Sequence, residues 1–190
     1  ADGTTTGFDC GPANALMDHW CERHLGRSFD SAGDWAASGT VDAKLLGAMQ
    51  GDPYFALAPP KSSGRDRFNP QWLERALAVA PAREARDVQA TLAELTARVC
   101  ATDVLRHAGT AGELLVCGGG AFNDHLIRRL SALLPGVSVV RTDVRGLPAT
   151  QVEAAAFAWL ACAHCERRTA NIPAVTGAAG ARVLGALYPA

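Results

Sequence analysis

Asp9 is the first residue in the chain whose type and position suit catalysis. It lies in the segment DCGPAN, between a β-prone run and the start of a helix. A carboxylate in such a turn can take a proton from water or hold a metal-bound water. The alternative, which the local pattern favours, is that Asp9 accepts hydrogen bonds from the Gly11 or Ala13 amides as a cap. Asn14 follows near the helix start, where its side chain suits either a ligand or solvent.

The segment LLVCGGGAFND is a second candidate site, because its apolar run ends at Gly118, Gly119 and Gly120. A short continuous apolar run predicts a strand that is buried on both faces of a parallel sheet. Three glycines open the backbone to a ligand at a sharp turn, and Asn123 can cap the following helix, whose unpaired amides favour an anion. Neither a dinucleotide fingerprint nor a P-loop is present. Nucleotide binding and a purely structural turn are therefore equally open.

Two further polar groups suit a substrate. Lys61, Ser62 and Arg65 place two cations and a hydroxyl around a glycine, an arrangement that fits a phosphate or a sugar acid, although it also fits an ordinary polar loop. Glu153 follows Thr150 in a capping-box pattern before an apolar run. Its carboxylate therefore either caps the helix, which the pattern favours, or accepts hydrogen bonds from sugar hydroxyls.

The six cysteines do not indicate a disulfide framework, because a chain of 190 residues can bury a core without cross-links. Cys162, His164 and Cys165 include a CxxC spacing, but no second pair of ligands has a matching spacing. We therefore expect reduced thiols and no zinc or redox centre at this segment, and the sequence assigns no metal ligands.

The composition indicates a globular protein, with 48% hydrophobic residues and a formal net charge of −1. The absence of a Lys/Arg run argues against nucleic acid and anionic membranes as partners, since both require a concentrated basic field. No apolar run reaches the roughly 18 residues of a membrane helix, and the first residues do not resemble a signal peptide. We expect a cytoplasmic protein.

An α/β fold has to position these residues. The pattern predicts a strand over 4–8, a helix over 12–26 and the longest helix over 87–104. Two strands, over 114–117 and 137–140, enclose a helix in a βαβ unit, which predicts a parallel pair.

Residues 27–86 are expected to form a helical and loop insertion. Short helices are predicted over 30–38 and 42–50, and a surface loop rich in proline, glycine and serine over 52–69. The nearly wholly apolar segment 150–165 predicts a final helix that is buried.

The chain resembles the C-terminal half of the anhydro-N-acetylmuramic acid kinase family, within the superfamily of actin, hexokinase and Hsp70. The similarity runs nearly end to end, through GFDCGPANALMD, SGTVDAKLL, DPYFALAPPKSSGRDRFNPQWL, DVQATLAELTA, LLVCGGGAFNDHL, QVEAAAFAWLA and NIPAVTGA. The resemblance implies an α/β, ribonuclease H-like lobe of the actin-like ATPase type, with a mixed sheet, flanking helices and the helical insertion. Residues 1–190 would then be the second lobe of a two-lobe sugar kinase.

The resemblance also implies an activity. Enzymes of this family open the 1,6-anhydro ring of their amino sugar with water and phosphorylate O6, using ATP and magnesium, during bacterial cell-wall recycling. It implies ATP and Mg as cofactors, the amino sugar and ATP as partners, and a homodimer. A chain that has no counterpart of the N-terminal lobe, with its phosphate loop, is expected to be a truncated or excised piece that is inactive alone.

Specific residues carry these implications. Asp9 matches the base that activates water, and Glu153 matches a glutamate that faces the sugar. The residues that match nucleotide-binding positions are Gly11, Asn14, Gly118, Gly119, Gly120 and Asn123. Cys10, Ala13 and Phe122 depart from the family pattern, and the methyl group of Ala13 narrows a turn that usually holds glycine. Two alternatives stay open: a non-catalytic nucleotide- or sugar-binding module, and a half-enzyme that needs a separate N-terminal lobe.

Overall fold

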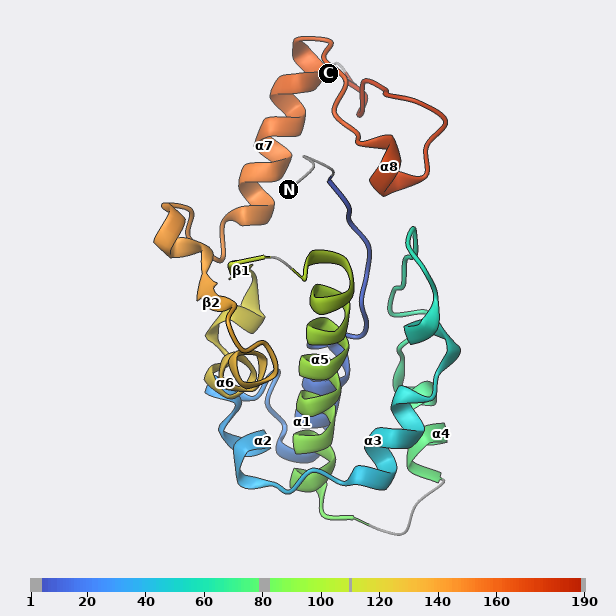
Figure 1. Ribbon diagram of the computed structural model, residues 1–190, viewed down its shortest axis with the longest axis vertical. Helices are drawn as coiled ribbons and strands as arrows, with labels where there is room; N and C mark the ends of the chain where they lie inside the picture. The colour runs from blue at the N-terminus through green and yellow to red at the C-terminus, as the bar shows by residue number, and fades with distance from the viewer. Residues whose placement is uncertain (1–4, 79–82, 110, 189–190) are drawn as a thin grey trace.

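The computed structural model describes residues 5–78, 83–109 and 111–188. In this part of the chain, α-helices and short 3-10 helices make up most of the structure, and a small sheet lies to one side, next to α6 (Figure 1). The α-helices are α1 (Ala15–Leu25), α2 (Asp34–Ser38), α3 (Ala43–Gln50), α4 (Pro70–Ala78), α5 (Ala85–Ala108), α6 (Asp124–Leu133), α7 (Val152–Cys165) and α8 (Pro173–Thr176). The 3-10 helices are η1 (Ser31–Gly33), η2 (Pro53–Ala56), η3 (Gly119–Phe122) and η4 (Thr142–Arg145), and the strands are β1 (Glu113–Val116) and β2 (Ser138–Arg141).

The long helix α5 is the centre of the helical body (Figure 1). It packs against α1, α2, α3 and α6, so that side chains on most of its surface are buried. Even its polar residue Glu94 is only 2% exposed, and it is paired with Arg98 and Arg129 at 2.7 Å each. Burial alone would raise the pKa of Glu94, but hydrogen bonds from the two arginines outweigh it and hold the pKa below its ordinary value.

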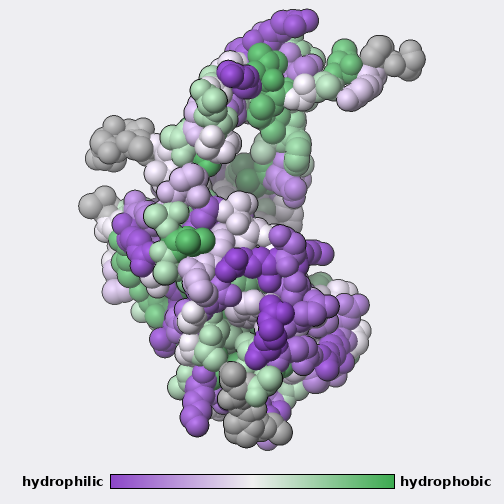
Figure 2. Space-filling model, turned by 90° about the vertical axis from the view of Figure 1, so that its right-hand side faces the viewer, coloured by the Kyte–Doolittle hydropathy of each residue, from purple (hydrophilic) through white to green (hydrophobic). Residues whose placement is uncertain are grey.

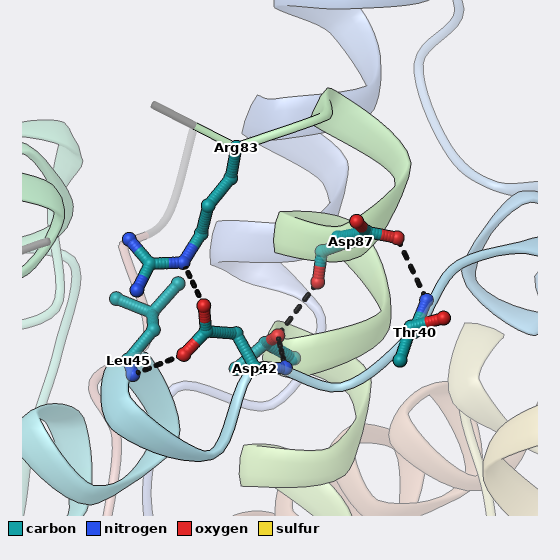
Figure 3. A network of polar contacts seen from close by, with 6 residues as sticks. Thr40, Asp42, Leu45, Arg83 and Asp87 are labelled. Carbon is teal, nitrogen blue, oxygen red and sulfur yellow. Dashed lines mark hydrogen bonds and ion pairs between the residues drawn. The ribbon is translucent and has the colours of Figure 1, made fainter. Parts of the chain in front are cut away.

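Polar contacts fasten the segment before α3 to the start of α5 (Figure 3). The Thr40 amide donates to Asp87 Oδ1 at 2.7 Å, and the Asp42 amide donates to Thr91 Oγ1 at 3.0 Å. Asp42 caps α3 by accepting from the Leu45 amide at 2.8 Å, and it also pairs with Arg83. Residues of the expected insertion over 27–86 thus share contacts and a core with α5, while their status as an insertion remains a prediction.

The predicted βαβ unit is confirmed. Strands β1 and β2 pair in parallel, with Glu113 opposite Ser138, and α6 connects them. The expected strand over 4–8 is wrong for residues 5–8, which form no strand, and Thr4 lies outside the described residues. The expected mixed sheet is also not found, because the described residues contain only this parallel pair. An extended segment without a neighbouring strand has no ladder of hydrogen bonds to join.

The helix predicted over 150–165 is present as α7, but its predicted burial is wrong. Phe157 is 64% exposed and Trp159 is 50% exposed, and Ala163 is the buried residue of this helix. Figure 1 shows the reason: α7 projects away from the helical body, so the described chain does not cover it. On the face that Figure 2 shows, hydrophobic residues gather on this upper extension, whereas the lower body is mainly hydrophilic. Among the described residues, no helix is both long and apolar enough to cross a membrane.

Candidate active site

Asp9 is held at both its backbone and its carboxylate. Its amide donates to the Lys61 carbonyl at 3.2 Å, and its carbonyl accepts from the Tyr54 hydroxyl at 2.7 Å. Its Oδ2 atom accepts from Ser62 Oγ at 2.9 Å and from the Ser63 amide at 2.8 Å. No donor in the described part of the chain bonds to Oδ1. One carboxylate oxygen therefore fixes the orientation, and the other is available to a proton.

These contacts test one of the two interpretations of Asp9, the cap, and leave its role as a base a prediction. The cap on Gly11 or Ala13 is wrong, because the carboxylate bonds to the loop at 62–63 instead. Asp9 is exposed and lines a cavity of about 380 Å³ together with Gly11 and Arg65. A carboxylate of fixed orientation beside an open cavity is an arrangement that suits a general base.

The turn after Asp9 has an unusual backbone. Ala13 has a φ of 48°, in the left-handed region where glycine is favoured, and its carbonyl accepts from Thr96 Oγ1 of α5 at 2.9 Å. Gly11 lies so close to α5 that a Cβ there would be 3.0 Å from Val99 Cγ2. The turn therefore packs against α5, and Ala13 adopts a strained, left-handed backbone conformation there.

Three of the predicted nucleotide residues, Asn14, Gly119 and Asn123, line a second cavity, of about 520 Å³. Gly11 lines the first cavity instead. A Cβ on Gly120 would lie 3.4 Å from Asn14 Nδ2. Gly118 has a φ of 73°, so the turn there needs a glycine. Asn123 also caps α6 by accepting from the Leu126 amide at 2.9 Å, as predicted. The Asp9 turn and the glycine turn, more than a hundred residues apart in the sequence, thus lie next to each other.

Sequence reasoning missed several residues that line this second cavity. Asp18 follows Asn14 by one helical turn on α1, a spacing that could have revealed it. Burial raises the pKa of Asp18, and the nearby Arg65 charge opposes this. Phe29, 62% exposed, and Phe122, 44% exposed, also line the cavity and give it an apolar component.

Lys61 is placed differently from Ser62 and Arg65. Its side chain is only 2% exposed, and Nζ lies 3.2 Å from Asp103 Oδ2 of α5. The ammonium also lies over the rings of Phe8 and Tyr54, at 5.4 and 5.2 Å from their centroids. Lys61 makes this ion pair without a well-aligned hydrogen bond. In this structure the Lys61 charge faces the interior, and so it does not reach the cavity beside Asp9.

Glu153 lies apart from both cavities. It is exposed in the first turn of α7, a helix whose start has no side-chain cap. The capping box predicted with Thr150 is therefore not formed. The role of Glu153 toward a sugar stays a prediction.

The sequence matches the family described as anhydro-N-acetylmuramic acid kinase over residues 1–190. It is 61% identical over 184 residues to the anhydro-N-acetylmuramic acid kinase of Variovorax paradoxus (strain S110), covering 97% of this chain and 49% of that protein. It is 57% identical to the protein of the same name from Albidiferax ferrireducens, covering 97% of this chain and 47% of that protein. The corresponding protein of Cupriavidus pinatubonensis is also 57% identical, with 98% and 50% covered. The chain thus spans about half the length of the curated relatives it matches.

Proposed function

Since this chain belongs to the anhydro-N-acetylmuramic acid kinase family, we propose that it supplies the base-bearing lobe of an ATP-dependent kinase for that amino sugar. The proposed reaction converts anhydro-N-acetylmuramic acid, ATP and water into N-acetylmuramic acid 6-phosphate and ADP, in the cytoplasm, as part of cell-wall sugar recycling. We further propose that the lobe is of the ribonuclease H-like type found in actin-like ATPases. The parallel β1 and β2 pair with its α6 crossover supports this proposal.

The orientation of Asp9 is the observation that carries the proposed chemistry. With Oδ2 held by the 62–63 loop, Oδ1 is free to take a proton from a water molecule in the cavity. That water attacks the anomeric carbon of the sugar, and the bond from this carbon to O6 breaks. O6 then attacks the γ-phosphorus of ATP, and ADP leaves. Arg65 at the same cavity offers a cation to a carboxylate or phosphate oxygen.

The second cavity is the proposed place of ATP. Asn14 and the backbone at Gly119 offer polar contacts, while Phe29 and Phe122 offer apolar surface to the base. When bound, ATP supplies the phosphoryl group. Magnesium would be held by the phosphates of the nucleotide, by water and by one or two carboxylates, and Asp18 and Asp30 are the carboxylate residues that line this cavity. When bound, it would neutralise the charge of the phosphates, and no step proposed here passes through it.

Complementation provides the test. The 190 residues are mixed with the half of the Variovorax paradoxus kinase that they do not cover, and sugar phosphate is measured with ATP and the anhydro sugar. We expect no product from the chain alone, because phosphoryl transfer depends on positioning from both walls of the cleft. We expect product from the mixture, and its loss by about 10²-fold or more with Asp9→Asn. Asp66→Asn, an exposed carboxylate in the neighbouring loop, is the matched control.

The outcomes separate the alternatives. Product from the chain alone would refute the proposed division of the site. An Asp9→Asn variant as active as Asp66→Asn would refute the assignment of the base. Binding of ATP or sugar by the chain in calorimetry, with no product from any mixture, would instead favour the non-catalytic binding module. We also propose that the homodimer of the family, or the remaining half of the kinase, covers the exposed apolar residues of α7.

A further inference from the structure

Two cysteines from distant parts of the sequence meet beneath the Asp9 turn. Cys10 directly follows Asp9, and Cys100 lies in α5. The side chains of Cys10 and Cys100 interact, each shifting the pKa of the other, and all six cysteines are free thiols in this structure. A contact between two thiols is the starting arrangement for a disulfide.

The backbone around this contact is fixed on both sides. Gly11 approaches α5 so closely that an added Cβ would be 3.0 Å from Val99 Cγ2. Thr96 Oγ1 donates to the Ala13 carbonyl at 2.9 Å. The segment that holds Cys10 thus lies against the turn of α5 that holds Cys100. A disulfide needs this proximity, because its two Cα atoms have to lie within about 7 Å.

The two thiols differ in pKa, and Cys10 is accessible. Interaction with the Cys100 thiol is the main cause that lowers the pKa of Cys10, and the Lys61 ammonium adds to it, while burial and Asp103 oppose. The same interaction and burial raise the pKa of Cys100. Cys10 lines two cavities, of about 300 and 380 Å³, each of which is larger than a small peroxide. An accessible thiol with a lowered pKa beside a second thiol is typical of a cysteine pair that responds to oxidants.

We propose that Cys10 and Cys100 are a modification site that forms a reversible disulfide with a hydroperoxide as oxidant and ties the Asp9 turn to α5. The Cys10 thiolate attacks a peroxide oxygen, the O–O bond breaks, and Cys10 becomes a sulfenic acid as hydroxide leaves and takes up a proton. The sulfur of Cys100 then attacks the sulfur of Cys10. Its proton and the departing hydroxyl group form water. In total, two thiols and one hydrogen peroxide give one disulfide and two waters, and a dithiol reverses the reaction.

Peptide mapping of the oxidised chain tests this proposal. After treatment with hydrogen peroxide and blocking of free thiols, trypsin releases a peptide that ends at Arg23 and the peptide 99–106. We expect these two peptides to be joined as the dominant cross-link, with a loss of two of the six thiols and full recovery with dithiothreitol. Because the first peptide contains both Cys10 and Cys21, the experiment is repeated with Cys21→Ser, which should retain the cross-link.

Cys10→Ser and Cys100→Ser should each abolish the cross-link. If either variant fails to fold, the peptide maps of the unsubstituted chain and of Cys21→Ser are sufficient to test the proposal. A cross-link that disappears with Cys21→Ser would overturn the proposal. So would an oxidised protein in which Cys117, Cys162 or Cys165 is the modified residue while Cys10 and Cys100 remain free thiols.

Discussion

The buried ion pair of Lys61 and Asp103 allows a quantitative prediction for Lys61→Met. The two side chains are 2% and 8% exposed, so the substitution leaves the Asp103 carboxylate buried without its nearest cation. Breaking a buried pair in this way costs about 3–5 kcal/mol. Arg106 Nη1 lies 4.0 Å from Asp103 Oδ1 and offers partial compensation. We therefore expect a loss of about 3 kcal/mol in the free energy of unfolding.

The aromatic contacts of Lys61 are largely replaced in the variant. Because the ammonium is buried, each cation–π contact, with Phe8 and with Tyr54, contributes about 2 kcal/mol. The methionine sulfur makes contacts of about 0.3–1.5 kcal/mol with aromatic rings, which offset much of this loss. The predicted loss thus reflects the unpaired Asp103 charge. The double variant Lys61→Met with Asp103→Leu removes that charge, and it should recover most of the loss.

Urea unfolding followed by tryptophan fluorescence measures these differences, because Trp20 and Trp72 are buried. Lys44→Met is the control, since Lys44 is exposed on α3 and is the other lysine of the chain; it should change the stability by less than about 0.5 kcal/mol. A loss below about 1 kcal/mol for Lys61→Met would refute the reasoning. So would a double variant whose loss equals the sum of the single losses, since no coupling would then exist.

Three further predictions concern backbone geometry and pH, and urea unfolding tests each of them. Gly33→Ala should lose about 2–4 kcal/mol, because φ is 73° there and a Cβ would clash with Asn123 Oδ1; an unchanged stability would contradict this. Ala13→Gly should gain about 0.5 kcal/mol, since relief of the strain at a φ of 48° slightly exceeds the entropy cost of glycine; a lower midpoint would argue against strain. Hydrogen bonds from Arg83 and from the Leu45 amide lower the pKa of Asp42 to about 2. The stability that the charged Asp42 carboxylate gives the fold is therefore complete above a pH of about 4, and it is lost as the pH falls toward 2. Asp42→Asn keeps a good cap, and its stability deficit should therefore shrink over that pH range; a constant deficit would rule out the charge as the cause.

Local signals predicted the parts of the fold that depend on neighbouring residues. Asn123 as the cap of α6 and the parallel pairing of β1 with β2 follow from capping preferences and from the strand–helix–strand order. The inward direction of Lys61 could not be predicted, because its partner lies 42 residues later (103 − 61) and only the packing on α5 brings it near. Lysine in a polar loop is ordinarily exposed.

The site and the last helix show a second kind of limit. Pattern alone favoured a cap at Asp9, because the Ser62 and Ser63 donors are far away in the sequence. The apolar composition of α7 predicted that the helix is buried, and this was wrong, because composition does not say which surface would cover a helix. Phe157 and Trp159 remain exposed because little of the described chain packs over them; Arg168 lies over the Trp159 ring, at 5.7 Å from its centroid.

The two-stranded sheet has a consequence for the order of folding. The main core consists of side chains between Leu16 and Val99, all from the helical body and its loops, and it contains no residue of β1 or β2. In the described chain both strands are edges, and only Val139 of β2 packs against a second, smaller cluster, formed by Ala97, Leu126 and Leu130. A pair of strands with so small a core is marginally stable. The helical body should therefore form first and the sheet should dock onto it late. Amide hydrogens of β1 and β2, next to the glycine turn, should accordingly exchange with solvent at a lower opening free energy than those of α5.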